Sequence, residues 1–117
     1  MASSTDSCSQ REIRRYWDTQ FVQQLGTDPA TVAQGLIAKV SAADEAAWGK
    51  GTATDWAQET YQLAVSQAYG TLPKAGPSGV YALPDSYVTN ASSVVAQQLS
   101  KAGVRLAVVL NAALGKP

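Results

Sequence analysis

The chain has 117 residues, 45% of them hydrophobic and 15% charged, and nine acidic residues balance nine basic ones to a formal net charge of zero. This length predicts a single domain, and the neutral balance argues against strong sequence-independent DNA binding because no long-range field attracts phosphates. The sequence contains no histidine, which removes the commonest metal ligand and the commonest general base. Cys8 is its one cysteine, which excludes an intrachain disulfide and a thiolate-rich zinc site.

The printed sequence also lacks the patterns of membrane insertion and export. No apolar run approaches the roughly 20 residues that are needed to cross a bilayer. The start, MASSTDSCSQRE, has no apolar segment of the kind found in signal peptides. We therefore expect the chain as written to stay in the cytoplasm and to have no membrane partner.

The first predicted element is a helix over residues 11–25. Ile13, Trp17, Phe21 and Leu25 recur every four residues, which is the spacing of one helix face, and Gly26 follows as a stop.

Three more helix starts are marked by side chains that can accept a hydrogen bond from the backbone of the first turn. They are Asp28 before Pro29, Ser41 with Asp44, and Thr52 with Asp55. The last of these helices is predicted to run to about residue 69. Together with the first helix they fill the stretch 11–69.

A loop and a long helix complete the chain. Residues 70–84 carry three prolines within GTLPKAGPSGVYALP and are predicted to form a loop. Apolar residues then advance by threes and fours from Tyr87 to Ala113, which predicts a helix over 85–114, interrupted only by Gly103. We expect one all-α domain over residues 1–117, a compact bundle of about five helical segments that ends in this long helix.

Three stretches of the sequence resemble a known family. They are RRYWDTQFV, AAWGKGTATDWAQETYQLA and VYALPDSYVTNASSVVAQQLSKAGVRLAVVLN. Together they are similar to the C-terminal part of the S1/P1 nucleases, zinc-dependent enzymes that hydrolyse phosphodiester bonds of single-stranded DNA and RNA. The resemblance covers residues 13–114, roughly the last two fifths of a complete member, and leaves residues 1–10 unmatched.

The resemblance implies an almost wholly helical fold and a site in which histidines, aspartates and an N-terminal tryptophan hold three zinc ions. It also implies that complete members are typically secreted or periplasmic. The last ligands of such a site are a histidine and an aspartate four residues apart on one helix. Asp18 matches that aspartate, and Arg14 occupies the place of the histidine.

Arginine cannot replace a histidine ligand, because its guanidinium has five donors, no acceptor and a permanent charge. We therefore predict that Asp18 is a vestigial metal ligand, that the chain has no catalytic residue, and that it binds no cofactor and is inactive alone. The remaining ligands belong to an N-terminal half that we expect this chain to lack. A truncated gene, a shifted reading frame and a cropped sequence would each produce that result.

Other polar and aromatic residues have a structural and a functional interpretation. Arg14 and Asp18 are spaced as a solvated ion pair. Arg11, Arg14 and Arg15 beside Tyr16 and Trp17 mix charge and aromatic rings as single-strand binders do, although Trp17 lies on the apolar stripe and is predicted to pack in the core.

Two tryptophans and two carboxylates in the middle of the chain also have both a structural and a functional interpretation. Trp48 and Trp56 are likewise predicted to belong to the core. Asp55 and Glu59 have the spacing of a general acid and base on one helix, but Asp55 also fits a cap, which we favour.

Two hypotheses about function remain open. The chain is an inactive relative of the nucleases that binds nucleic acid weakly if at all, or it is a helical module for self-association or protein interaction. Val88, Val104 and Val108 widen the apolar stripe of the long helix, which predicts a homodimer or a higher oligomer. The missing N-terminal half of a nuclease is the alternative partner for this face.

Overall fold

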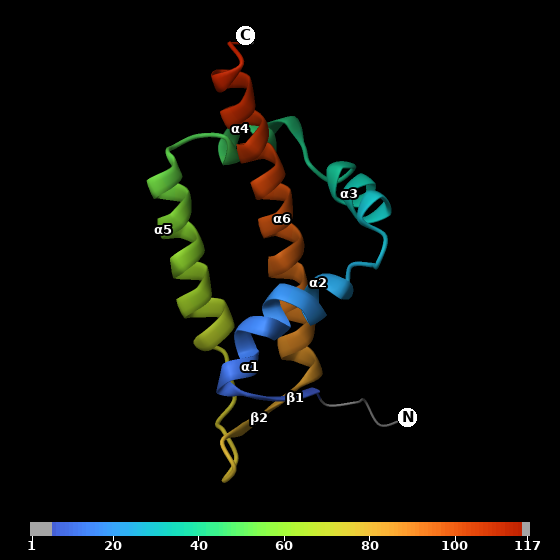
Figure 1. The fold of residues 1–117 in the computed structure, drawn as a ribbon, viewed down its shortest axis with the longest axis vertical. Coiled ribbons are helices and arrows are strands. Elements are labelled where there is room, and N and C mark those ends of the chain that lie inside the picture. Colours follow the sequence, from blue (N-terminus) through green and yellow to red (C-terminus); the bar gives the residue numbers. More distant parts are fainter. Residues whose placement is uncertain (1–5, 116–117) are drawn as a thin grey trace.

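Helix α6, Asp85–Ala113, runs through most of the molecule, and the other elements are arranged around it (Figure 1). The structure is a computed structural model that describes residues 6–115. Helix α6 has 29 residues and is therefore about 44 Å long. The molecule measures 56 × 30 × 21 Å. The long helix predicted over 85–114 is confirmed, and so is the all-α fold class.

The first helical run crosses α6 near the end where α6 begins (Figure 1). It comprises α1, Gln10–Arg15, the π-helical turn η1, Tyr16–Gln20, and α2, Phe21–Gln23. The predicted helix over 11–25 is therefore present, with one wider turn in its middle. Gly26 follows at φ 136°, a conformation that L side chains rarely adopt, and this explains why the run ends beside a glycine.

The capping patterns set the next three helices as the sequence predicts. These are α3, Pro29–Ile37, then α4, Ala42–Trp48, and then α5, Ala53–Leu63, which continues into the π-helical segment η2, Ala64–Tyr69. In each case the side chain before the helix accepts a hydrogen bond from the backbone N–H of its first turn. The pairs are Asp28 with Thr31, Ser41 with Asp44, and Thr52 with Asp55.

A short β-ribbon departs from the prediction. Strand β1, Asp6–Ser9, pairs antiparallel with β2, Val80–Leu83, so part of the predicted loop over 70–84 is extended and paired. Cys8 lies opposite Tyr81, and the side chains of Cys8 and Leu83 are buried. Four-residue strands are too short to show alternation. The pairing joins segments more than 70 residues apart, which local pattern cannot reveal. Residues 1–5 lie outside the described part of the chain.

The core of the described residues lies at the end where α6 begins. It joins β1, the first helical run, β2 and the first three turns of α6. Its buried residues are Cys8, Ile13, Phe21, Leu83, Tyr87, Ala91 and Val95. Toward its other end α6 has many exposed apolar side chains, so the core covers only part of this helix.

Candidate functional site

Arg14 and Asp18, the residues at the expected ligand positions, face solvent. The Nε of Arg14 lies 4.0 Å from a carboxylate oxygen of Asp18, and the two side chains are 86% and 69% exposed. A pair this open is screened by water and contributes little to stability, within about 1 kcal/mol. The structural interpretation, a solvated ion pair one helical turn apart, is therefore confirmed.

The aromatic residues beside this pair turn toward the protein. Trp17 packs against the core, its ring centroid 5.5 Å from that of Phe21 in an edge contact, and its Nε1 donates a hydrogen bond of 3.0 Å to the hydroxyl of Tyr87. Tyr16 donates from its hydroxyl to the carbonyl oxygen of Ser7. These rings are half-buried while the neighbouring arginines are exposed, so the rings face the core cluster and the arginines face solvent.

The π-helical turn η1 positions Asp18 away from the core. Within it the N–H of Phe21 donates to the carbonyl of Tyr16, five residues back, which widens the helix by one residue. Phe21 is 1% exposed, whereas Asp18 lies at the edge of an open hollow of about 970 Å³ between the first helical run, α5 and α6. The hollow also has Trp17, Trp56 and Arg105 in its walls.

A charged cluster joins α5 to α6 beside this hollow, and its Arg105 lines the hollow. Glu59 on α5 accepts hydrogen bonds from Lys101, at 2.7 Å, and from Arg105, both on α6. The two cations are only 11% and 13% exposed. The hydrogen bond from Lys101, with that from Arg105, holds the pKa of Glu59 below its ordinary value. Sequence reasoning missed this cluster, although Lys101 and Arg105 stand one turn apart on the long helix.

The tryptophans of the middle segment complete the cluster. Arg105 lies over the ring of Trp56, at 5.4 Å from its centroid, and donates from Nε to the backbone carbonyl of Trp48. Lys101 lies 6.0 Å from the centroid of the Trp48 ring. The prediction that both tryptophans belong to the core is wrong, because each is half-buried and holds a cation.

Asp55 and Glu59 do not form a general acid and base pair. Asp55 accepts from the backbone N–H and the hydroxyl of Thr52, at 2.8 and 3.1 Å, as a capping residue does. Glu59 is held as a carboxylate by two cations, and its pKa is lowered rather than raised toward that of a general acid. The capping interpretation of Asp55 is confirmed.

The residues at the expected ligand positions do not fit a zinc site. Asp18 offers a single exposed carboxylate that pairs with a guanidinium, and a cation beside it repels a metal ion. Among residues 6–115, no three His, Cys, Asp or Glu side chains lie close enough together to hold a metal. No catalytic step through zinc can be derived from the described residues.

Comparison with known proteins identifies the family to which the chain belongs. The family model S1/P1 Nuclease matches residues 6–115. The chain therefore belongs to the S1/P1 nuclease family, and the match includes β1, which precedes the residues that carried the resemblance. No curated protein and no solved structure matches the chain. Within the described residues, no helix has the length and apolar character to cross a membrane.

Proposed function

We propose that this chain is a member of the S1/P1 nuclease family that does not hydrolyse nucleic acid by itself. One observation supports the proposal above others. The resemblance aligns Arg14 with a histidine ligand of complete members, and the guanidinium of Arg14 places a permanent positive charge 4.0 Å from Asp18. The total absence of histidine from the sequence supports it as well.

The chemistry of phosphodiester hydrolysis explains why this observation matters. Zinc enzymes of this kind need a bound metal to generate hydroxide at neutral pH and to offset the charge that develops on the phosphate. Without histidine, Ser and Thr hydroxyls have no imidazole to activate them either. Arg14 and its neighbours could still attract phosphate, but with a net charge of zero the chain binds nucleic acid weakly.

The test is metal content together with hydrolysis, measured on the purified chain. We expect less than stoichiometric zinc after dialysis against a zinc-containing buffer, and no zinc-dependent cleavage of single-stranded DNA or RNA. One or more tightly held zinc ions per chain, or cleavage that a chelator abolishes, would contradict the proposal.

Substituting Arg14→His tests the assignment of Asp18. The variant restores a histidine one turn before the aspartate, so we expect its affinity for zinc to rise while hydrolysis stays absent, because two ligands do not make a catalytic site. Arg11→His is the matched control, since Arg11 is exposed on the same helical run but lies seven residues from Asp18. Equal zinc affinity in both variants would show that Asp18 is wrongly assigned.

A second role, as a module for association, is favoured by the apolar surface of α6. Leu106, Val109, Leu110 and Leu114 are 47–71% exposed in the last turns of the helix or just after it. A stable monomer rarely leaves a large contiguous apolar patch in water. Either another copy or the N-terminal half of a nuclease would cover this surface.

A further inference from the structure

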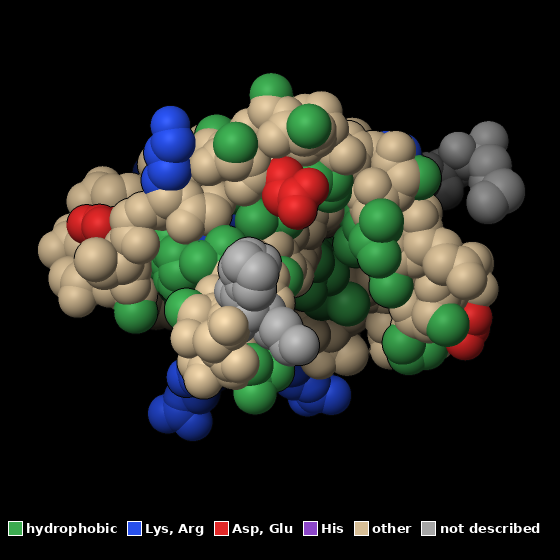
Figure 2. Space-filling view, turned by 90° about the horizontal axis from the view of Figure 1, so that it is seen from above, with side chains coloured by type: hydrophobic (Ala, Val, Ile, Leu, Met, Phe, Trp, Pro, Cys, Tyr) green, Lys and Arg blue, Asp and Glu red, His purple; other side chains and the backbone are tan. Residues whose placement is uncertain are grey.

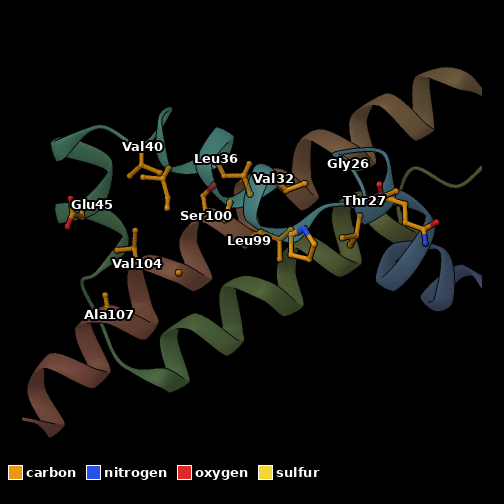
Figure 3. A pocket seen from close by; sticks show the side chains of 16 residues that line it. Gly26, Thr27, Val32, Leu36, Val40, Glu45, Leu99, Ser100, Val104 and Ala107 are labelled. Atoms are coloured by element: carbon orange, nitrogen blue, oxygen red, sulfur yellow. The ribbon is translucent and has the colours of Figure 1, made fainter.

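An apolar groove lies between α3 and α6. Its volume is about 760 Å³, within the range of sites that bind whole ligands. Figure 3 shows Val32 and Leu36 of α3 on one side, with Leu99, Ser100 and Val104 of α6 on the other. Glu45 is at one end. Seen from above, hydrophobic side chains surround a hollow in the molecule (Figure 2).

The floor of the groove contains a glycine with space above it. A Cβ built on Gly103 would meet no atom within 4 Å, so this glycine is not explained by any close packing inside the chain. Ala107, one turn further on, also lines the groove. Because glycine and alanine are the smallest residues, the surface of α6 is low at these two positions of the groove.

The same face of α6 continues beyond the groove as a ridge. At 3.6 residues per turn, Ala107, Leu110 and Leu114 all fall within about 40° of Gly103 around the helix axis. Leu110 is 47% exposed and Leu114 is 71% exposed. One helix face therefore consists of a hollow half, lined by Leu99 and Gly103, and a protruding half, formed by the two leucines.

We propose that a second copy of this chain occupies the groove, with the two α6 helices antiparallel across a two-fold axis near Ala107. Leu110 of each chain then rests over Gly103 of the other and Leu114 reaches Leu99, so the axis passes between positions 106 and 107 and brings Ala107 beside its own copy. A two-fold interface requires one patch that is complementary to itself. This face meets the requirement because its ridge and its hollow lie at nearly equal distances from Ala107, the ridge residues three and seven positions after it and the hollow residues four and eight before it.

The exposed area of the chain is large enough for such an interface. Its accessible surface is 8077 Å², whereas a folded monomer of 12.3 kDa is expected to expose about 6,100 Å². The excess exceeds what one partner contributes to a standard interface, about 800 Å². A second copy would remove much of this excess from water.

Charge does not oppose this packing. No acidic or basic residue occurs from Leu106 to Gly115, so the ridge itself brings no charge into the groove, and Glu45 is the charged residue among those that line it. Two of the three valines that widen the apolar stripe of α6 make contacts within the chain. Val88 packs against the core cluster, and Val108 lies over α4, where its Cγ2 is 3.0 Å from the Cβ position of Gly49.

Leu110→Glu and Val109→Glu form a matched pair that tests the surface. Both positions are on α6 and are exposed to 47% and 49% respectively, but only Leu110 lies on the proposed face. By sedimentation equilibrium of the full chain at tens of micromolar, we expect a dimer that Leu110→Glu weakens by more than about tenfold and Val109→Glu leaves nearly unchanged. Equal effects of the two substitutions would overturn the proposal, provided that circular dichroism shows both variants to be helical.

Cysteine cross-linking tests the position of the axis and does not depend on a disruptive charge. Ala107→Cys should form a disulfide-linked dimer under mild oxidation, whereas Ala112→Cys, on the opposite side of α6, should not. The native Cys8 is buried and is present in both variants, so it does not account for a difference in cross-linking between them.

The other possible occupants give results that overturn the proposal. A monomer that binds an apolar dye would mean that the groove takes small molecules. A monomer without dye binding would mean that the chain covers this face itself. A dimer that fails to cross-link through position 107 would have its interface elsewhere. None of these results bears on zinc content or hydrolysis, so the proposed function is tested separately.

Discussion

Tyr87 shows how one side chain joins three elements at the residue scale. Its hydroxyl donates a hydrogen bond of 2.6 Å to the backbone carbonyl of Ala68 in η2 and accepts one from Trp17 Nε1. Its ring packs with those of Trp17 and Phe21. One polar atom in the core therefore satisfies both a carbonyl of η2 and an indole of the first helical run.

Tyr87→Phe should lower the free energy of unfolding by about 1–3 kcal/mol, because two polar groups at the core lose their partner. Tyr61→Phe is the control, since Tyr61 is 63% exposed, and it should change stability by less than about 0.5 kcal/mol. Urea unfolding of the two variants measures the difference. Similar effects would show that the Tyr87 hydroxyl contributes nothing specific.

The same residue gives a dependence on pH. Burial raises the pKa of Tyr87 above its ordinary value of 10.0. The unfolded chain therefore loses this proton first as the pH rises, so the contribution of Tyr87 to stability is full below about pH 10 and is lost above it. The stability difference between the wild type and Tyr87→Phe should shrink in that range, and a constant difference would contradict the burial.

Glu59 on α5 forms ion pairs with two cations of α6, Lys101 and Arg105. Glu59→Gln should lower the free energy of unfolding by about 1–2 kcal/mol at neutral pH, because Lys101 and Arg105 then face each other without a carboxylate. Asp18→Asn removes a carboxylate from the exposed pair and should cost less than about 0.5 kcal/mol.

Acid titration of these variants supplies the second measurement. The hydrogen bond from Lys101 lowers the pKa of Glu59 below 4.5, its ordinary value. Its contribution is therefore present above about pH 4.5 and is lost as the pH falls further. We expect the wild type and Glu59→Gln to converge in stability there, and a difference that persists would mean that the carboxylate acts through packing instead.

At the scale of elements, α6 combines a well-packed beginning with a poorly covered end. Its first turns carry Tyr87, Ala91 and Val95 into the core, all at most 7% exposed. Past Arg105 its side chains are all exposed. The helix extends so far because its sequence favours helix along the whole length, although tertiary contacts hold only part of it.

Gly103→Ala tests whether any part of the same chain contacts the middle of α6 at Gly103. In the Leu110→Glu background, which we expect to be monomeric, alanine should raise the free energy of unfolding by up to about 1 kcal/mol, since its Cβ meets open space and helix propensity improves. Gly35→Ala is the matched control in α3, where a Cβ also meets no atom within 4 Å. Destabilisation by Gly103→Ala alone would indicate a contact at Gly103 within the chain.

At the scale of the whole molecule, the fold is more elongated than a compact domain with the same number of residues. Its radius of gyration is 16.5 Å, whereas a compact domain of this length has one of about 13 Å. The core lies near the end where α6 begins, and α3, which lines the groove together with α6, lies further along the molecule (Figure 1). An uncovered groove of this kind is the surface on which we propose that a second copy docks.

Local sequence determined the helices and the family. Asp28, Ser41 and Thr52 place three helix starts because a capping bond joins residues three positions apart, and the periodicity of α6 is carried along its own length. The exclusion of a zinc ligand at Arg14 needed only the chemistry of guanidinium. These features depend on neighbours in the chain, which a sequence displays directly.

Tertiary structure decided the rest. The β-ribbon, the cluster of Glu59 with Lys101 and Arg105, and the groove beside Gly103 each join residues that are distant along the chain. The two tryptophans predicted to be core hold cations instead, because their surroundings come from α6 and not from their own helices. A side chain's partners across helices depend on how the helices pack. That packing minimises the free energy of the whole chain, and no local pattern records it.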